Sequence, residues 1–130
     1  MDQHTEHASH TLVALRELPD DNAEGSFGAG YDARFARAAL GCEQTGVSLQ
    51  RLDADARQTF AHHHQADEEI YVVLAGSGVA TVDDETITLR PWSALRIAPA
   101  AVRSFAAGPH GLEFLAFGTH TEDDGNIVPL

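Results

Sequence analysis

The chain has 130 residues, 43% of them hydrophobic and 22% charged, a composition typical of a globular protein with a single hydrophobic core. Its 20 acidic residues outnumber 8 basic ones, all of them arginine, and the formal net charge is −12. Phosphate groups are bound by clustered Lys and Arg, so this charge argues against nucleic acid and anionic membranes as partners.

Nothing in the sequence indicates export or membrane insertion. Cys42 is the only cysteine, so no disulfide can form within the chain. The first residues lack the basic segment and apolar run of a signal peptide, and no apolar run approaches the roughly 20 residues of a membrane helix. The expectation is one domain, spanning residues 1–130, in the cytoplasm.

The N-terminal third is predicted to contain little regular structure. Residues 1–10 are polar and are predicted to be a disordered tail. Residues 11–15 are short and apolar enough for an edge strand, and the acidic, glycine-containing segment 20–30 is predicted to be a loop. Residues 35–40 are ambiguous, because their alanine content favours a helix whereas a β-rich context can override that propensity.

From Gly46 onward the sequence alternates between short strand-like runs and turn-forming residues. Residues 76–78 are expected to form a hairpin turn and residues 108–111 another turn. The expected strands are 47–52, 59–64, 69–75, 79–82, 86–89, 94–98, 102–106 and 112–117. Many short strands at this spacing predict an all-β sandwich or barrel. The apolar chain end, 127–130, is expected to pack on the barrel or on a partner subunit.

A candidate metal site lies in the segment 62–69. Successive side chains of a strand point to opposite faces, so His62 and His64 share a face while His63 points away. Their Cα atoms are separated by roughly 6.6 Å at about 3.3 Å per residue. Two imidazoles at this separation can converge on one metal ion, and Glu69 can reach the same point if its strand doubles back. Two histidines and one carboxylate leave open positions on a metal such as Fe(II).

The same residues resemble the first conserved motif of the cupin superfamily. His62, one residue, His64, four residues, Glu69, six residues and Gly76 match that motif position by position. The resemblance covers about residues 47–117 and implies a double-stranded β-helix, that is, a jelly-roll barrel. It also implies that His62, His64 and Glu69 bind a divalent metal ion such as Fe, Mn, Ni or Zn.

The second cupin motif is incomplete. Pro99 fits the proline of that motif, and Trp92 occupies about the place of its glycine. The position of the usual histidine, a further metal ligand, is occupied by Ser104, or by Arg103 if the loop is one residue shorter. A metal in this chain would therefore have three protein ligands, with water or substrate completing its coordination, or would be bound weakly.

The resemblance implies a small-molecule ligand but leaves the activity open. A metal-dependent oxygenase is the first hypothesis. The alternatives are a non-catalytic or metal-free cupin that binds or senses a small ligand, and a metal-dependent isomerase or lyase. Tyr71 is either a catalytic phenol or a packing residue, since it should share a face with Glu69. Ser104 and Arg103 are candidates for the substrate pocket. By analogy with other single-domain cupins, the chain is expected to form a homodimer.

Overall fold

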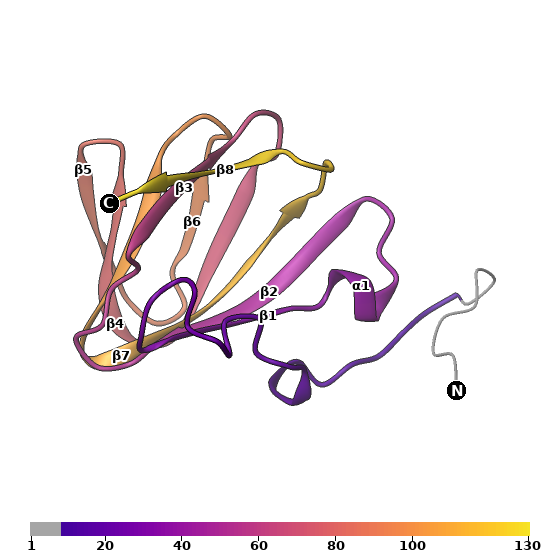
Figure 1. Ribbon diagram of the computed structural model, residues 1–130, viewed down its shortest axis with the longest axis horizontal. Helices are drawn as coiled ribbons and strands as arrows, with labels where there is room; N and C mark the ends of the chain where they lie inside the picture. The colour runs from indigo at the N-terminus through magenta and orange to yellow at the C-terminus, as the bar shows by residue number, and fades with distance from the viewer. Residues whose placement is uncertain (1–8) are drawn as a thin grey trace.

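The structure, a computed structural model, describes residues 9–130 and is built almost entirely from antiparallel strands (Figure 1). The tail expected at residues 1–10 therefore lies, up to residue 8, outside the described part. The elements in chain order are η1 (Leu15–Glu17), β1 (Tyr31–Phe35), α1 (Arg37–Leu40), β2 (Thr45–Leu52), β3 (Phe60–His64), β4 (Glu69–Val82), β5 (Glu85–Leu89), β6 (Ala94–Ile97), β7 (Arg103–Thr119) and β8 (Gly125–Pro129).

The two longest strands, β4 and β7, each take part in two faces of a curled sheet, which makes the jelly roll. The first half of β4 pairs with β6 and with the second half of β7, which continues through β2 to β1. The second half of β4 pairs with β5 and with the first half of β7, which continues through β3 to β8. In Figure 1, β3 and β8 consequently lie opposite β1 and β2, with the long strands connecting the two sides.

The expected turns at residues 76–78 and 108–111 are wrong. Both segments lie within the long strands, at the point where β4 and β7 bend together, and the register between them shifts there. Gly76 and Gly111 have positive φ angles of 81° and 76°. A Cβ atom on Gly76 would lie only 2.0 Å from the carbonyl oxygen of Gly111. The glycines therefore permit a bulge and a close backbone approach, rather than a reversal of the chain.

The N-terminal third contains more structure than the sequence indicated. Residues 11–15 form no strand, and Leu12 is 93% exposed, so no core contact stabilises it there. Residues 31–35 form β1 along β2, with Tyr31 and Ala33 buried. The ambiguous segment 35–40 divides into the end of β1 and the one-turn helix α1.

The C-terminal end and the second-motif region complete the barrel. The apolar chain end packs on it as β8, which pairs with β3 along its whole length. Trp92, in the place of the motif's glycine, has the left-handed φ angle of 66° that a glycine would favour. Stacked aromatic rings fill the centre, with Phe105 and Phe114 centroids 4.7 Å apart and Tyr71 4.8 Å from Phe105. Among the described residues, no helix has the length and apolar character needed to cross a membrane.

Candidate metal centre

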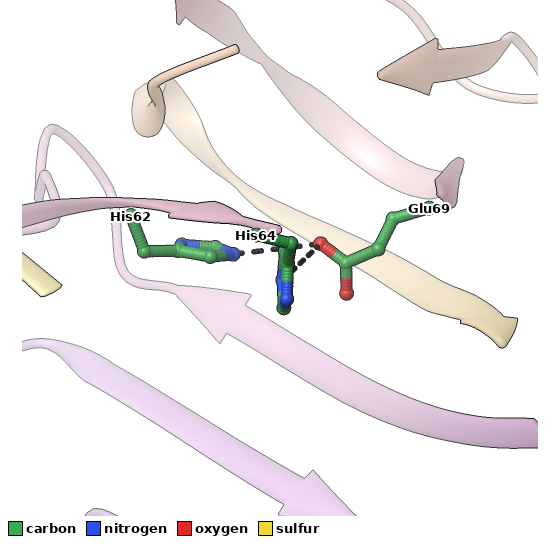
Figure 2. A group of neighbouring side chains, drawn as sticks. All are labelled: His62, His64 and Glu69. Atoms are coloured by element: carbon green, nitrogen blue, oxygen red, sulfur yellow. Dashed lines mark hydrogen bonds and ion pairs between the residues drawn. The ribbon is translucent and has the colours of Figure 1, made fainter. Parts of the chain in front are cut away.

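His62, His64 and Glu69 converge on one point inside the barrel (Figure 2). The two histidines project from the same face of β3, with ring centroids 5.2 Å apart and planes at 86°. Glu69 is the first residue of β4, after the chain has doubled back through a short loop. Its Oε1 atom lies 3.4 Å from His62 Nε2 and 3.2 Å from His64 Nε2. The convergence expected from the sequence is therefore present.

The loop between β3 and β4 is held by two buried aspartates. Asp124, at the end of the β7–β8 loop, accepts hydrogen bonds from the backbone N–H groups of Ala66 and Asp67. The Asp67 carboxylate in turn accepts hydrogen bonds from Thr121 and from the hydroxyl of Thr119. These hydrogen bonds hold the conformation of the loop, which sets the distance in space between the two histidines and Glu69.

Asp124 also contacts the site itself. Its Oδ2 atom lies 3.4 Å from Nδ1 of His64, the ring nitrogen that does not face Glu69. Burial acts to raise the pKa of Asp124, but the backbone hydrogen bonds from Asp67 and Ala66 outweigh it, and the net shift is downward. Since both aspartates are occupied by the loop, the group His64, Asp67 and Asp124 serves as a support of the first group rather than as a second metal site.

Glu69 is ionised in this environment. Burial acts to raise its pKa, but the interactions with the rings of His62 and His64 and the hydroxyl of Tyr71 outweigh it and hold the pKa well below its ordinary value. The Tyr71 hydroxyl donates a short hydrogen bond of 2.5 Å to Glu69 Oε1. Burial raises the pKa of Tyr71 well above 10, so the phenol stays protonated at neutral pH. The interaction with Glu69 also raises the pKa of His64.

Arg103, one of the two residues expected at the histidine position of the second cupin motif, lies beside this group. It is paired with His62 across β3 and β7, and its side chain is completely buried. Its Nη2 atom donates to the carbonyl oxygen of Ala98, and Nη1 lies 3.8 Å from Glu69 Oε1. Nε and Nη1 have no hydrogen-bond partner. A buried guanidinium thus lies beside the Glu69 carboxylate.

The donor set fits a divalent transition metal. Two imidazole nitrogens and one ionised carboxylate suit Fe, Mn, Ni or Zn. Both nitrogen atoms of the His64 ring are buried and have no hydrogen-bond partner, and the same holds for Nδ1 of His62. A metal ion would satisfy the inward-facing nitrogen of His64, and three protein ligands would leave further positions for water or substrate.

A cavity of about 260 Å³ opens onto the candidate metal centre, which forms its inner wall together with Tyr71. Ser104 does not line this cavity; it lines a separate one on the other side of the barrel wall, with Thr81 and Leu130. The alternation along β7 explains this, because Arg103 points inward and its neighbour points outward. Arg51 and Arg96, which are half or more exposed, form ion pairs with acidic residues on the surface.

Sequence reasoning did not identify the remaining walls of the cavity. They come from β1, β2, β8, the first residue of β3 and the loops before β1 and β3, and include Phe27, Tyr31, Phe35, Ser48, Gln50, Gln58, Phe60 and Ile127. The alternation of Tyr31, Ala33 and Phe35 with polar residues was a usable signal for a strand. No local pattern indicated that this strand would face the histidines.

Comparisons with known proteins find similar folds among solved structures only. No family model matches the sequence. A comparison with curated proteins likewise finds no match. Among solved structures, the polyketide cyclase RemF from Streptomyces resistomycificus is similar, with a TM-score of 0.75 and 18% identity over 92% of this chain and 84% of that chain.

Two further structures are similar to different extents. A mutant of salicylate 1,2-dioxygenase from Pseudoaminobacter salicylatoxidans, in complex with gentisate, has a TM-score of 0.62 and 15% identity over 75% of this chain and 29% of that chain. A cupin protein from Bacteroides fragilis has a TM-score of 0.71 and 26% identity over 89% of this chain and 88% of that chain. With the bent pair of long strands and the first-motif residues inside the barrel, this similarity shows that the chain has the fold of a small cupin.

Proposed function

We propose that this cupin binds one divalent metal ion through Nε2 of His62, Nε2 of His64 and the carboxylate of Glu69, and acts on a small organic molecule in the adjoining cavity. The observation that carries the proposal is the convergence of these three groups on the inner wall of an open cavity. The gentisate complex of the similar dioxygenase is consistent with a small ligand in such a barrel.

An oxygenase is the activity that we place first. A bound metal with free coordination positions would support O₂ chemistry or polarise a substrate oxygen. An isomerase or lyase would additionally need a general base, and Tyr71 is a poor base because burial raises its pKa and keeps it protonated. In this proposal Tyr71 holds Glu69 in place through its short hydrogen bond and is available as a proton donor at the wall of the cavity.

A metal-free cupin that binds or senses a small ligand is the second candidate. The buried guanidinium of Arg103 favours it, since this group already supplies a positive charge 3.8 Å from Glu69 Oε1. A fixed cation at this distance competes with a metal ion for the same carboxylate.

Metal analysis distinguishes the two candidates. Protein purified without a histidine tag and incubated with Fe(II), Mn(II), Ni(II) or Zn(II) should retain about one ion per chain after desalting. We expect His62→Ala, His64→Ala and Glu69→Ala to lose the ion while keeping the fold by circular dichroism. His63→Ala is the matched control, because this neighbour points away from the site. Wild-type protein that retains none of the four metals would favour the metal-free candidate.

We also propose that the chain forms a homodimer through its outer surface. Among the described strands, β1 and β8 are at the edges of the sheet, and Ile127 on β8 is 56% exposed. The net charge of −12 keeps nucleic acid and anionic membranes outside the proposal.

A further inference from the structure

We infer that the cavity binds a neutral, planar aromatic molecule that carries a hydroxyl or carbonyl oxygen, with its ring between the aromatic walls and its oxygen directed at the candidate metal centre. The inference deepens the proposed function and rests on it only for the direction of the oxygen. The binding of the ring depends on the cavity walls alone.

The outer walls of the cavity are aromatic. Phe60, which begins β3, lies at the centre of a cluster, with its ring centroid 5.1 Å from that of Phe27 and 5.9 Å from that of Tyr31. The Phe60 ring also lies 6.3 Å from the His62 ring. Tilted and edge-to-face arrangements at these distances are the ones that aromatic rings prefer. A planar ring entering the cavity would extend this cluster as far as the histidines.

In the absence of a bound metal ion, the charges of the lining disfavour an anionic ligand. None of the described residues that line the cavity is Lys or Arg, and its carboxylates belong to Asp21 and Glu69. Arg103 lies behind Glu69, is completely buried and does not line the cavity. In the metal-free protein a carboxylate or phosphate group would therefore leave water without gaining a cationic partner in the lining, and would face two acidic groups.

The polar side chains of the walls are largely occupied by one another, which disfavours a polyol. The Tyr31 hydroxyl donates to Gln50 Oε1, and Gln50 Nε2 donates to Ser48 Oγ. The Asn22 amide is hydrogen-bonded to the backbone of its own loop and to the carbonyl oxygen of Tyr31 in β1. Few groups remain for a ligand with many hydroxyls, whereas one or two oxygens can be accommodated at the metal-centre end.

The mouth and the size of the cavity agree with this ligand. Phe27, Phe35 and Ile127 are 40%, 57% and 56% exposed, although all three belong to the lining. An apolar mouth of this kind marks an entry for an apolar molecule. The volume of about 260 Å³ is slightly below the roughly 300–1,000 Å³ of pockets for drug-sized ligands, so the ligand has few fused rings.

Calorimetric titration of metal-free, chelator-treated protein tests the ligand class with three matched probes. Naphthol has the expected shape and charge, naphthoate adds a negative charge, and decahydronaphthol keeps the hydroxyl but loses the aromatic plane. We expect naphthol to bind one per chain, and the other two to bind weaker by on the order of tenfold or more. Equal or tighter binding of naphthoate or decahydronaphthol would overturn the inference.

A pair of variants locates the binding. Phe27 and Phe117 are both 40% exposed, but only Phe27 lines the cavity. Phe27→Ala should weaken naphthol binding about tenfold and Phe117→Ala should leave it unchanged. The same loss in both variants, or in neither, would show that naphthol does not bind in this cavity.

A separate measurement tests whether the ligand oxygen is directed at the candidate metal centre. Wild-type protein should prefer naphthol to naphthalene, and Glu69→Gln should reduce that preference. An unchanged preference would overturn the orientation. Retained naphthol binding in a protein that binds no metal would overturn the proposed metal function but not the ligand class.

Discussion

Replacing Arg103, the buried cation beside the candidate metal centre, should lower the stability of the metal-free protein and raise its affinity for a divalent metal ion. In Arg103→Met the side chain keeps much of its length but loses its charge. Arg103 is completely buried, and its Nη1 lies 3.8 Å from Glu69 Oε1. Opposite unit charges near 4 Å interact by about 4 kcal/mol at an effective dielectric constant of about 20.

The expected loss of stability is smaller than this interaction. The hydrogen bond from Arg103 to the carbonyl oxygen of Ala98 contributes about 1 kcal/mol more. Against it, two buried guanidinium nitrogens without partners are removed, which relieves roughly 3 kcal/mol of desolvation. We therefore expect Arg103→Met to destabilise the metal-free protein by about 2 kcal/mol, less than the 3–5 kcal/mol typical of a broken buried pair. Glu69 keeps its hydrogen bonds from His62 and Tyr71, which limits the loss.

Metal affinity should change in the opposite direction. A divalent ion at Glu69 no longer competes with the guanidinium in Arg103→Met, so Zn(II) should bind at least about tenfold more tightly. This factor corresponds to about 1.4 kcal/mol, a third of the unit-charge interaction, which allows for screening by solvent at the open cavity.

Urea unfolding in the presence of chelator measures the stability, and competition with a chromogenic chelator measures the Zn(II) affinity. Arg96→Met is the matched control, because Arg96 is 63% exposed and its ion pair with Glu68 is on the surface. We expect this variant to change the stability by less than about 1 kcal/mol and the affinity not at all. Zn(II) affinity that is unchanged or lower in Arg103→Met would refute the competition between the guanidinium and the metal.

Three further predictions concern the supports of the site and the assembly. Asp124→Ala should lower Zn(II) affinity by roughly 10–100-fold, because the carboxylate beside His64 Nδ1 is lost. The control variant Glu122→Ala, at an 85% exposed side chain, should keep the wild-type affinity. Equal affinities of the two variants would show that Asp124 only holds the loop. Gly76→Ala should lower the free energy of unfolding in urea by at least about 3 kcal/mol, because backbone strain and a clash with Gly111 add. The control Gly25→Ala, with a similar φ but open space around it, should lose about 1–2 kcal/mol. Equal losses in the two variants would refute the close approach of β4 and β7 at Gly76. Multi-angle light scattering should give twice the chain mass of 13.9 kDa, and a single mass would contradict the homodimer.

The residues of the candidate metal centre were identified from the sequence because their arrangement is local. His62 and His64 share a face through the alternation of a single strand, and only a short loop separates them from Glu69. The resemblance of this segment, ending at Gly76, to the first cupin motif implied a jelly roll, and the fold confirms it. These features depend on neighbours in the chain.

The bends of the two long strands were misread because glycine indicates backbone freedom and not the direction that the chain takes. Gly76 and Gly111 have the positive φ angles expected of turns. In a hairpin this freedom would reverse the chain. Here it lets β4 and β7 approach each other and pass from one face of the barrel to the other. The partner strand, distant in the sequence, decides between the two outcomes.

The sequence alone determined the β-rich class, the acidic charge and three converging side chains, since each follows from composition or from the period of one strand. Only the tertiary structure decided the surroundings of those side chains. Arg103 is buried beside Glu69, Asp124 contacts His64, and aromatic residues of β1 and β3 line a common cavity. The physical reason is that charge burial and cavity shape depend on groups brought together from distant segments, whose register no local pattern specifies.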